Sequence, residues 1–279
     1  MSRWPTAMVE TKSVDATGPD ATAPLRAEFV LEARDVRKRF GHVQALRGAS
    51  LQVRPGEVLA LIGDNGAGKS TLTKIMSGAL EPDSGELAFW GEVTAVQSIE
   101  HAQSLGVETV YQDLALAPDL SVAENMFLGR EWFTPGRVAG WLRSLDRRRM
   151  REAAEAALAD MGITLQSVAS PVRDLSGGQR QAIAVARAVM WAKSAILMDE
   201  PTAALGTRQT AIAYESIRSA AAKGLAVVVI SHDIPKMLDL ADRIAVLRQG
   251  RTIASHPAAD LDLTDVVSLM LGGGVTHAA

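Results

Sequence analysis

The stretch that decides the fold runs from Val58 to Ser70 and reads VLALIGDNGAGKS. Its first five residues are apolar, which is typical of a strand buried on both faces of a sheet. Gly63 to Ser70 match the phosphate-loop pattern G-x-x-x-x-G-K-[ST], for which chance gives about 1% odds in a chain of this length. A helix is expected from about Lys69 to Ser77, so the loop lies between a strand and a helix. We therefore predict that the chain binds a nucleoside triphosphate.

Each residue type in this loop has a place in phosphate binding. Glycines allow backbone N–H groups to turn inward and cradle phosphate oxygens at the positive end of the following helix. Lys69 is expected to place its charge on the β and γ phosphates, Ser70 to bind Mg²⁺, and Thr71 to add a donor. The residues predicted to contact the nucleotide here are Gly63, Asp64, Asn65, Gly66, Ala67, Gly68, Lys69, Ser70 and Thr71.

Two acids directly follow a second apolar run, Ala195 to Met198. A strand that ends in Asp199 would deliver its carboxylate to the magnesium shell beside the phosphate loop. The next side chain points elsewhere, so Glu200 could act as the general base for the water that attacks the γ-phosphorus. The alternative is a strand that ends in solvated acids, and the phosphate loop favours the functional interpretation.

The composition is that of an ordinary globular protein. Of 279 residues, 47% are hydrophobic and 22% charged, which excludes a disordered, collagenous or coiled-coil chain. The 29 basic and 32 acidic residues give a net charge of −3, so no nucleic-acid partner is expected. The absence of cysteine excludes disulfides, thiolate metal sites and a cysteine nucleophile. Because the longest apolar run, Leu225 to Ile230, cannot span a bilayer and no signal peptide is recognisable, a soluble intracellular protein is expected.

Changes in composition and hydrophobic periodicity along the sequence divide the chain into a tail, a folded domain and a second tail. Residues 1–27 are predicted to be a disordered tail, residues 28–267 the domain, and residues 268–279 a flexible tail. A helical insertion is expected at about 113–177, with a helix from Leu145 to Met161. The other predicted elements are strands Phe29–Ala33, Gln44–Val53 and Val227–Ile230, a helix Gln179–Trp191, and a hairpin of Arg243–Leu247 with Arg251–Ala254. Buried strands that alternate with helices indicate a parallel α/β sheet.

Leu175 to Gln179 reads LSGGQ, which resembles the signature motif of the ATP-binding cassette (ABC) family. The resemblance covers essentially residues 28–267, with the motifs in the family's order. It implies an α/β phosphate-loop core with an antiparallel β subdomain and a helical insertion. Gln112 resembles the Q-loop glutamine, His232 the switch histidine, and Phe40 the aromatic residue that stacks on adenine.

The resemblance also implies a dimer and a division of roles. Ser176, Gly178 and Gln179 would face the ATP held by another protomer, so two chains in head-to-tail arrangement would enclose two ATP molecules. The implied catalytic residues are Glu200, His232 and Gln112, and the implied Mg²⁺ ligands are Ser70, Gln112 and Asp199. One segment departs from the family: Ala203-Ala204-Leu205-Gly206 stands where Ser-Ala-Leu-Asp is usual, which puts the coupling of the two sites in question.

Two further segments resemble the ATPases of bacterial ribose, xylose and fructose importers. These are Val110 to Leu116 and Asn125 to Glu131. The resemblance implies a single-cassette ATPase that powers monosaccharide import. Its implied partners are a second cassette, two membrane permease subunits docked near Gln112, and indirectly a periplasmic sugar-binding protein, and its implied place is the cytoplasmic face of the bacterial inner membrane.

Other interpretations of the sequence remain open. A soluble ABC ATPase acting on ribosomes or DNA would share every nucleotide motif, and so would an exporter cassette or a cassette for another substrate. A binding protein that does not hydrolyse ATP is disfavoured because Lys69, Asp199, Glu200 and His232 are all present. The arginine-rich run from Arg143 to Arg151 is interpreted as a solvated helix face rather than a nucleic-acid or lipid patch, because acids interrupt it.

Overall fold

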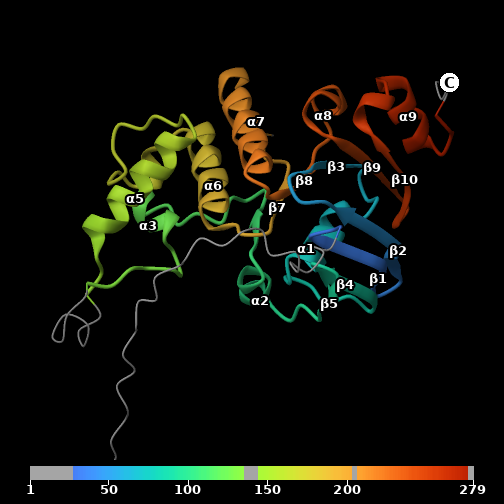
Figure 1. The fold of residues 1–279 in the computed structure, drawn as a ribbon, viewed down its shortest axis with the longest axis horizontal. Helices are drawn as coiled ribbons and strands as arrows, with labels where there is room; N and C mark the ends of the chain where they lie inside the picture. The colour runs from blue at the N-terminus through green and yellow to red at the C-terminus, as the bar shows by residue number, and fades with distance from the viewer. Residues whose placement is uncertain (1–27, 135–143, 203–205, 276–279) are drawn as a thin grey trace, which may run out of the picture.

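The computed structural model describes residues 28–134, 144–202 and 206–275 (Figure 1). The predicted tail at residues 1–27 lies outside these ranges. The strands are β1 Leu31–Phe40, β2 Val43–Val53, β3 Val58–Ile62, β4 Ser84–Phe89, β5 Glu92–Val93, β6 Val107–Val110, β7 Ala195–Asp199, β8 Ala226–Ile230, β9 Arg243–Arg248 and β10 Arg251–Pro257. The α-helices are α1 Lys69–Met76, α2 Ile99–Ser104, α3 Val122–Met126, α5 Arg147–Asp160, α6 Gly177–Trp191, α7 Thr207–Ala222, α8 Ile234–Leu240 and α9 Leu263–Leu271.

The larger sheet has the strand order β10-β9-β3-β8-β7-β6. Every neighbouring pair from β9 to β6 is parallel, and β10 returns antiparallel to β9. The turn between β9 and β10 uses Gln249 and Gly250, both with positive φ, as a tight two-residue hairpin requires. The predicted parallel α/β sheet and its C-terminal hairpin are therefore confirmed.

This sheet is covered on both faces, which explains its continuous apolar strands. Alternate residues of a strand point to opposite faces. Leu59 and Leu61 of β3 pack in one cluster with α1 and the second sheet. Val58, Ala60 and Ile62 pack in another cluster, to which α6, α7, α8 and α9 contribute. Full burial of a valine, leucine or isoleucine side chain stabilises a fold by about 1.5–3 kcal/mol relative to exposure.

The smaller sheet is antiparallel, with the order β2-β1-β4-β5. In Figure 1 it lies beside α1, on the side of the parallel sheet away from α7 and α8. The structure places β1 at Leu31–Phe40, whereas the sequence predicted Phe29–Ala33. The prediction ended too early because the outer half of β1 is polar and exposed, yet it pairs with β2 up to the contact of Phe40 with Val43.

Helices α3, α5 and one face of α6 form a separate lobe with its own apolar cluster (Figure 1). Phe127 is fully buried at its centre, with edge-to-face contacts to Trp132 and Trp191 at centroid distances of 4.7 and 5.5 Å. Helix α6 contributes Ile183 to this cluster and Val185 to the cluster under the parallel sheet. The lobe is therefore joined to the sheet through the helix that begins at the LSGGQ segment.

The C-terminal domain boundary predicted at residue 267 falls inside helix α9. Helix α9 continues to Leu271, because the Asp262 side chain accepts a hydrogen bond from the N–H of Asp265 at its start and Leu269 is buried on its inner face. It ends at Gly272, whose φ of 93° is the left-handed conformation of a helix C-cap. Among the described helices, none is long and apolar enough to cross a membrane.

Candidate active site

A cavity of about 550 Å³ opens at the carboxyl ends of β3, β7 and β8. Loops that follow parallel strands meet at this edge of a sheet, so residues far apart in the sequence converge there. The structure brings most of the predicted site residues to this one cavity. Its lining residues are Phe40, Val43, Gln44, Ala45, Asn65, Gly66, Ala67, Gly68, Lys69, Ser70, Thr71, Gln112, Asp199, Glu200, Ile230 and His232.

The phosphate loop has a backbone that requires glycine at its end. Gly68 has a φ of 107° and is the N-cap of α1, and a Cβ there would lie 2.7 Å from the carbonyl oxygen of Ala45. A side chain at this position would therefore be strained and would also collide with β2. The N-terminus of α1 faces the cavity through Lys69, Ser70 and Thr71. This arrangement presents backbone donors and a positive helix end to an anion.

Lys69 lies folded against its own loop. Its Nζ donates to the carbonyl oxygens of Gly63 at 2.5 Å and Asp64 at 3.0 Å. Burial lowers the pKa of Lys69, and the carboxylates of Glu200, Asp199 and Asp64 act in the opposite direction. The hydrogen bonds of the half-buried Lys69 ammonium go to neutral carbonyl oxygens. Its positive charge can therefore attract a phosphate oxygen in the cavity.

Glu200 and His232 contact each other directly. The Nδ1 atom of His232 lies 3.0 Å from both carboxylate oxygens of Glu200. Glu200 has a φ of 52°, a strained conformation for a residue other than glycine, and its N–H donates to the carbonyl of Ile230 on β8. The Glu200 side chain is mostly buried, whereas that of His232 is 77% exposed. The carboxylate is therefore held at the cavity wall by backbone and imidazole together.

The donor atoms in the cavity fit a magnesium ion that is bound together with a nucleotide. Ser70, Gln112 and Asp199 contribute hydroxyl, amide and carboxylate oxygens to one lining, and oxygen ligands are those Mg²⁺ prefers. Within the described ranges, no group of three or more His, Cys, Asp or Glu residues could hold a metal by itself. Mg²⁺ commonly uses few protein ligands and completes its shell with phosphate oxygens and water, which agrees with this set.

Phe40, the last residue of β1, lines the nucleotide cavity. Its side chain is 50% exposed although it is aromatic, and Lys38 Nζ lies 5.9 Å from the ring centroid. An exposed ring at the rim of a polar cavity offers a flat surface for a base. Val43, Gln44 and Ala45 extend this wall, and sequence reasoning missed them because no motif marks the start of β2.

The LSGGQ segment lies away from this cavity. Ser176 is the N-cap of α6: its hydroxyl accepts from the N–H of Gln179 at 3.2 Å, and the Gln179 side chain accepts from the N–H of Ser176. Gly178 is buried in the first turn. Gly178 and Gln179 line a different cavity, between α6 and α7. Within one chain, therefore, the structure does not bring the signature residues to the phosphate loop.

The remaining sequence candidates occupy ordinary positions. Arg148 is 90% exposed and pairs with Glu152, and Arg149 stacks on Trp132, so the described part of the arginine-rich run is a paired helix face. Residues 203–205 of the unusual segment lie outside the described residues. Gly206 is the N-cap of α7.

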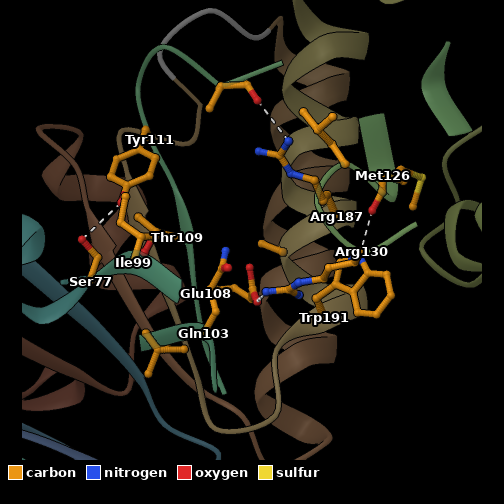
Figure 2. Close-up of a pocket in the computed structure, with 14 residues that line it drawn as sticks. Ser77, Ile99, Gln103, Glu108, Thr109, Tyr111, Met126, Arg130, Arg187 and Trp191 are labelled. Atoms are coloured by element: carbon orange, nitrogen blue, oxygen red, sulfur yellow. Dashed lines mark hydrogen bonds and ion pairs between the residues drawn. The ribbon is translucent and has the colours of Figure 1, made fainter. Parts of the chain in front are cut away.

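A second cavity, of about 230 Å³, lies between β6 with α2 and the helical lobe (Figure 2). Arg130 and Glu108 form an ion pair at 2.5 Å on its wall, and Trp191 packs against Arg130. Burial raises the pKa of Glu108, an effect that Arg130 opposes. Figure 2 shows Arg187 on the same side of the cavity as Arg130. Sequence reasoning did not find this cavity, because its lining comes from five separate segments.

Comparison with known proteins gives the family. Residues 46–203 match the ABC transporter family. The chain is 46% identical over 246 residues to the fructose import ATP-binding protein of Rhizobium meliloti. The aligned residues cover 88% of this chain and 95% of that relative. The chain belongs to the ABC transporter family. It is an ATP-binding cassette, and the family assignment makes it an ATP-hydrolysing enzyme.

Other relatives and solved structures agree with this assignment. The cassette is 44% identical to the xylose/arabinose import ATP-binding protein of Sulfolobus acidocaldarius, covering 86% of this chain and 93% of that one. It is 42% identical to a ribose import ATP-binding protein of Rubrobacter xylanophilus, of which it spans 46%. A nucleotide-free cassette of an ABC transporter superposes with a TM-score of 0.69 at 26% identity, covering 82% of this chain and 91% of that one. A dimeric post-hydrolysis cassette bound to ADP and phosphate gives a TM-score of 0.68 at 25% identity, covering 82% and 98%.

Proposed function

We propose that this cassette hydrolyses ATP to power the import of a monosaccharide through a membrane permease. The observation that carries the proposal is the convergence of Lys69, Gln112, Asp199, Glu200 and His232 on one cavity beside the phosphate loop. The substrate class rests on the fructose, xylose/arabinose and ribose import proteins that the chain resembles at 42–46% identity.

ATP is proposed to lie along the cavity from Phe40 to His232. Adenine stacks on the exposed ring of Phe40, and the phosphates accept from the loop N–H groups. Lys69 turns from the carbonyls of Gly63 and Asp64 to the β and γ phosphates. Ser70, Asp199 and Gln112 would hold the Mg²⁺ that neutralises charge on the phosphates.

Glu200 is proposed as the general base. Its mostly buried carboxylate takes the proton of the water that attacks the γ-phosphorus, while His232 holds the carboxylate and contacts the γ-phosphate. Gln112, which lines the same cavity, positions the water or the γ-phosphate. The strained backbone at Glu200 supports this role, because strain of this kind is retained where a side chain must be aimed.

A second copy of the chain would complete the site. Ser176, Gly178 and Gln179 lie at the N-terminus of α6, away from the phosphate loop of their own chain. In a head-to-tail dimer this helix end meets the γ-phosphate bound by the other copy. The two-fold symmetry completes both nucleotide sites in the same way. ATP then joins the two chains, and hydrolysis lets them separate.

The second cavity is the proposed place for the permease, at the cytoplasmic face of the bacterial inner membrane. Tyr111 and Ala115, which flank Gln112 in the sequence, line this cavity, so its occupant is next to a residue of the nucleotide site. Ile99 and Leu128 expose 37% and 47% of their surface at its edge, which suits an amphipathic segment of a membrane protein. A periplasmic sugar-binding protein would act on the permease and not on this chain.

The test is affinity purification of the tagged chain from detergent-solubilised membranes of its own host, with partners identified by mass spectrometry. We expect a polytopic permease and a periplasmic sugar-binding protein. Leu128→Ser should weaken permease recovery, and Leu263→Ser is the matched control, because Leu263 is equally exposed (48%) but lies on α9 (Figure 1). Recovery only from the soluble fraction, with ribosomal or DNA-bound partners, would overturn the transport proposal.

A further inference from the structure

The backbone just after Gln112 is strained. Leu114 and Ala115 have φ values of 62° and 44°. Among the residues that the structure describes, no other two consecutive non-glycine residues both have a positive φ. Each pays a steric cost, because in the left-handed conformation the Cβ atom approaches the following carbonyl oxygen. The segment begins with a turn in which the N–H of Leu114 donates to the carbonyl of Tyr111.

Arg187, on α6, hydrogen-bonds to both residues of this pair. From the middle of α6, its Nη1 donates to the carbonyl of Ala115 at 3.0 Å and its Nη2 to the carbonyl of Leu114 at 3.3 Å. The planar guanidinium thus bridges the two carbonyls of the strained pair, which a lysine could not do in the same way. Burial lowers the pKa of Arg187, and Glu108 opposes this effect. A desolvated guanidinium bonds strongly to the carbonyls that face it.

The segment that Arg187 holds belongs to both cavities. Gln112 lines the nucleotide cavity, and Tyr111 and Ala115 line the second cavity, where Arg187 itself lies (Figure 2). A change of backbone conformation at Leu114 and Ala115 would therefore move Gln112 relative to the phosphate loop. Arg187 is not a lining residue of the nucleotide cavity, and its hydrogen bonds to Leu114 and Ala115 connect it to the segment that carries Gln112.

We propose that Arg187 is a positioning residue for ATP hydrolysis: it holds Leu114 and Ala115 in the left-handed conformation and thereby keeps Gln112 in the nucleotide cavity. The inference rests on the proposed role of Gln112. It adds that the signature helix α6, through one guanidinium, sets the position of the Gln112 segment.

The kinetic test measures kcat and KM for ATP, with magnesium, on the full-length chain. Arg187→Gln should lower kcat about tenfold, the equivalent of losing the hold on one strained residue, with KM changed less than about twofold. KM is spared because Phe40 and the phosphate loop are untouched. Arg187→Lys should fall between the wild type and Arg187→Gln.

Rescue by glycine separates positioning from packing. Ala115→Gly removes the Cβ that makes the left-handed conformation costly, so in the Arg187→Gln chain it should restore at least about half of the lost rate. Ala117→Gly, two residues further on at a position without positive φ, is the matched control and should restore none. If Arg187→Gln does not fold, the same pair of glycine variants is placed on Arg187→Lys. Equal rescue by both glycines, or by neither, contradicts the proposal.

A second readout does not depend on catalysis. Amide hydrogen exchange, followed by mass spectrometry, should become faster for residues 111–116 in Arg187→Gln and stay unchanged in the phosphate loop. Unchanged exchange at 111–116 would overturn the positioning role. If exchange rises but Gln112→Ala retains full kcat, the hold by Arg187 stands and the role of Gln112 in the proposed function is what fails.

Discussion

Glu200 and His232 show how contact geometry assigns roles at the scale of single residues. Both lie after a buried strand, and either could be expected to act on the γ-phosphate. The structure places the imidazole Nδ1 at equal distance from the two carboxylate oxygens, with the carboxylate mostly buried and the imidazole exposed. On our proposal the mostly buried carboxylate of Glu200 accepts the proton of the attacking water, and His232 holds this carboxylate in place.

Glu200→Gln tests this assignment. The amide keeps the size and the contact with His232 but cannot take a proton at neutral pH, so we expect ATP binding with very slow hydrolysis. The ATP-bound form should accumulate as a dimer with twice the 29.6 kDa mass of the chain. Light scattering after gel filtration with ATP, and a phosphate-release assay, measure the two effects.

Glu215→Gln provides the matched control for this variant. Glu215 is an exposed carboxylate on α7 outside the lining of the nucleotide cavity, so its loss should leave turnover unchanged. Near-normal turnover by Glu200→Gln would remove Glu200 from the mechanism.

At the scale of elements, helix α7 begins without a side-chain cap. Its N-cap is Gly206, with extended φ and ψ of −71° and 167° that a capping residue adopts. Gly206→Asp should add a hydrogen bond to the first turn and a negative charge at the positive helix end, raising the free energy of unfolding by about 0.5 kcal/mol. The new Cβ would meet only the flexible end of Gln209. Urea unfolding measures the change.

Gly206→Ala is the control for this substitution, because it adds the same Cβ without a capping oxygen. Alanine is a poorer N-cap than glycine, so Gly206→Ala should be less stable than the wild type. Equal stability of the Asp and Ala variants would show that capping does not limit α7. The aspartate is also the residue that the family usually carries here, so the same variant allows the coupling of two sites to be compared.

Helix α3 carries a capping box whose strength depends on pH. The Glu124 carboxylate accepts from the hydroxyl of Ser121 at 2.7 Å and from its N–H at 3.0 Å, and these bonds lower the pKa of Glu124. A carboxyl with a lowered pKa in the folded state stabilises the fold above its ordinary pKa of 4.5, and loses this contribution as the pH falls through the lowered value.

The variant Glu124→Gln therefore isolates the charge in this box. It should melt below the wild type at pH 7, and the two melting curves should converge in the acid range. Thermal unfolding from pH 7 to pH 3 follows this difference. A gap that stays constant down to pH 3 would mean that the carboxylate charge contributes nothing.

At the scale of the whole molecule, the described residues form three apolar clusters, each stabilising a different part of the fold. The helical lobe has a cluster of its own, while the two faces of the parallel sheet hold the other two. The phosphate loop and the acid pair follow strands of the parallel sheet. The second cavity, proposed as the place for the permease, lies between this sheet and the helical lobe. On our proposal, a conformational change at the permease would reach the nucleotide through the elements that the lobe and the sheet share. These are α6, which contributes to both apolar clusters, and the Gln112 segment, which lines both cavities.

Phe127→Ala tests the separateness of the lobe. Removing this fully buried ring should lower the free energy of unfolding by about 3–5 kcal/mol. ATP affinity measured well below the melting temperature should remain within a factor of about two, because no residue of the nucleotide cavity belongs to this cluster. Calorimetry and nucleotide titration give the two values.

Phe133→Ala serves as the control for the lost ring, since Phe133 is 40% exposed and should be less sensitive. A large loss of ATP affinity in Phe127→Ala would show that lobe and nucleotide site are one cooperative unit.

Local patterns were enough for a large part of this molecule. The phosphate loop, the acids after β7, the hairpin of β9 and β10 and the parallel sheet could each be predicted, because the residues that define them are contiguous or alternate with a fixed period. The last turn of α9 and the outer half of β1 could not, because partners elsewhere in the fold hold those residues in place.

The amino-acid sequence alone determined the chemistry that the chain carries: the motif residues, their order and the family to which they belong. Only the tertiary structure decided which of them meet. Gln112, Glu200 and His232 converge because parallel strands end at one edge of the sheet, whereas Ser176 stays apart on the helical lobe. Arg187 had no signal in the sequence, because its role depends on the left-handed backbone of Leu114 and Ala115, a conformation set by contacts across more than seventy residues of chain.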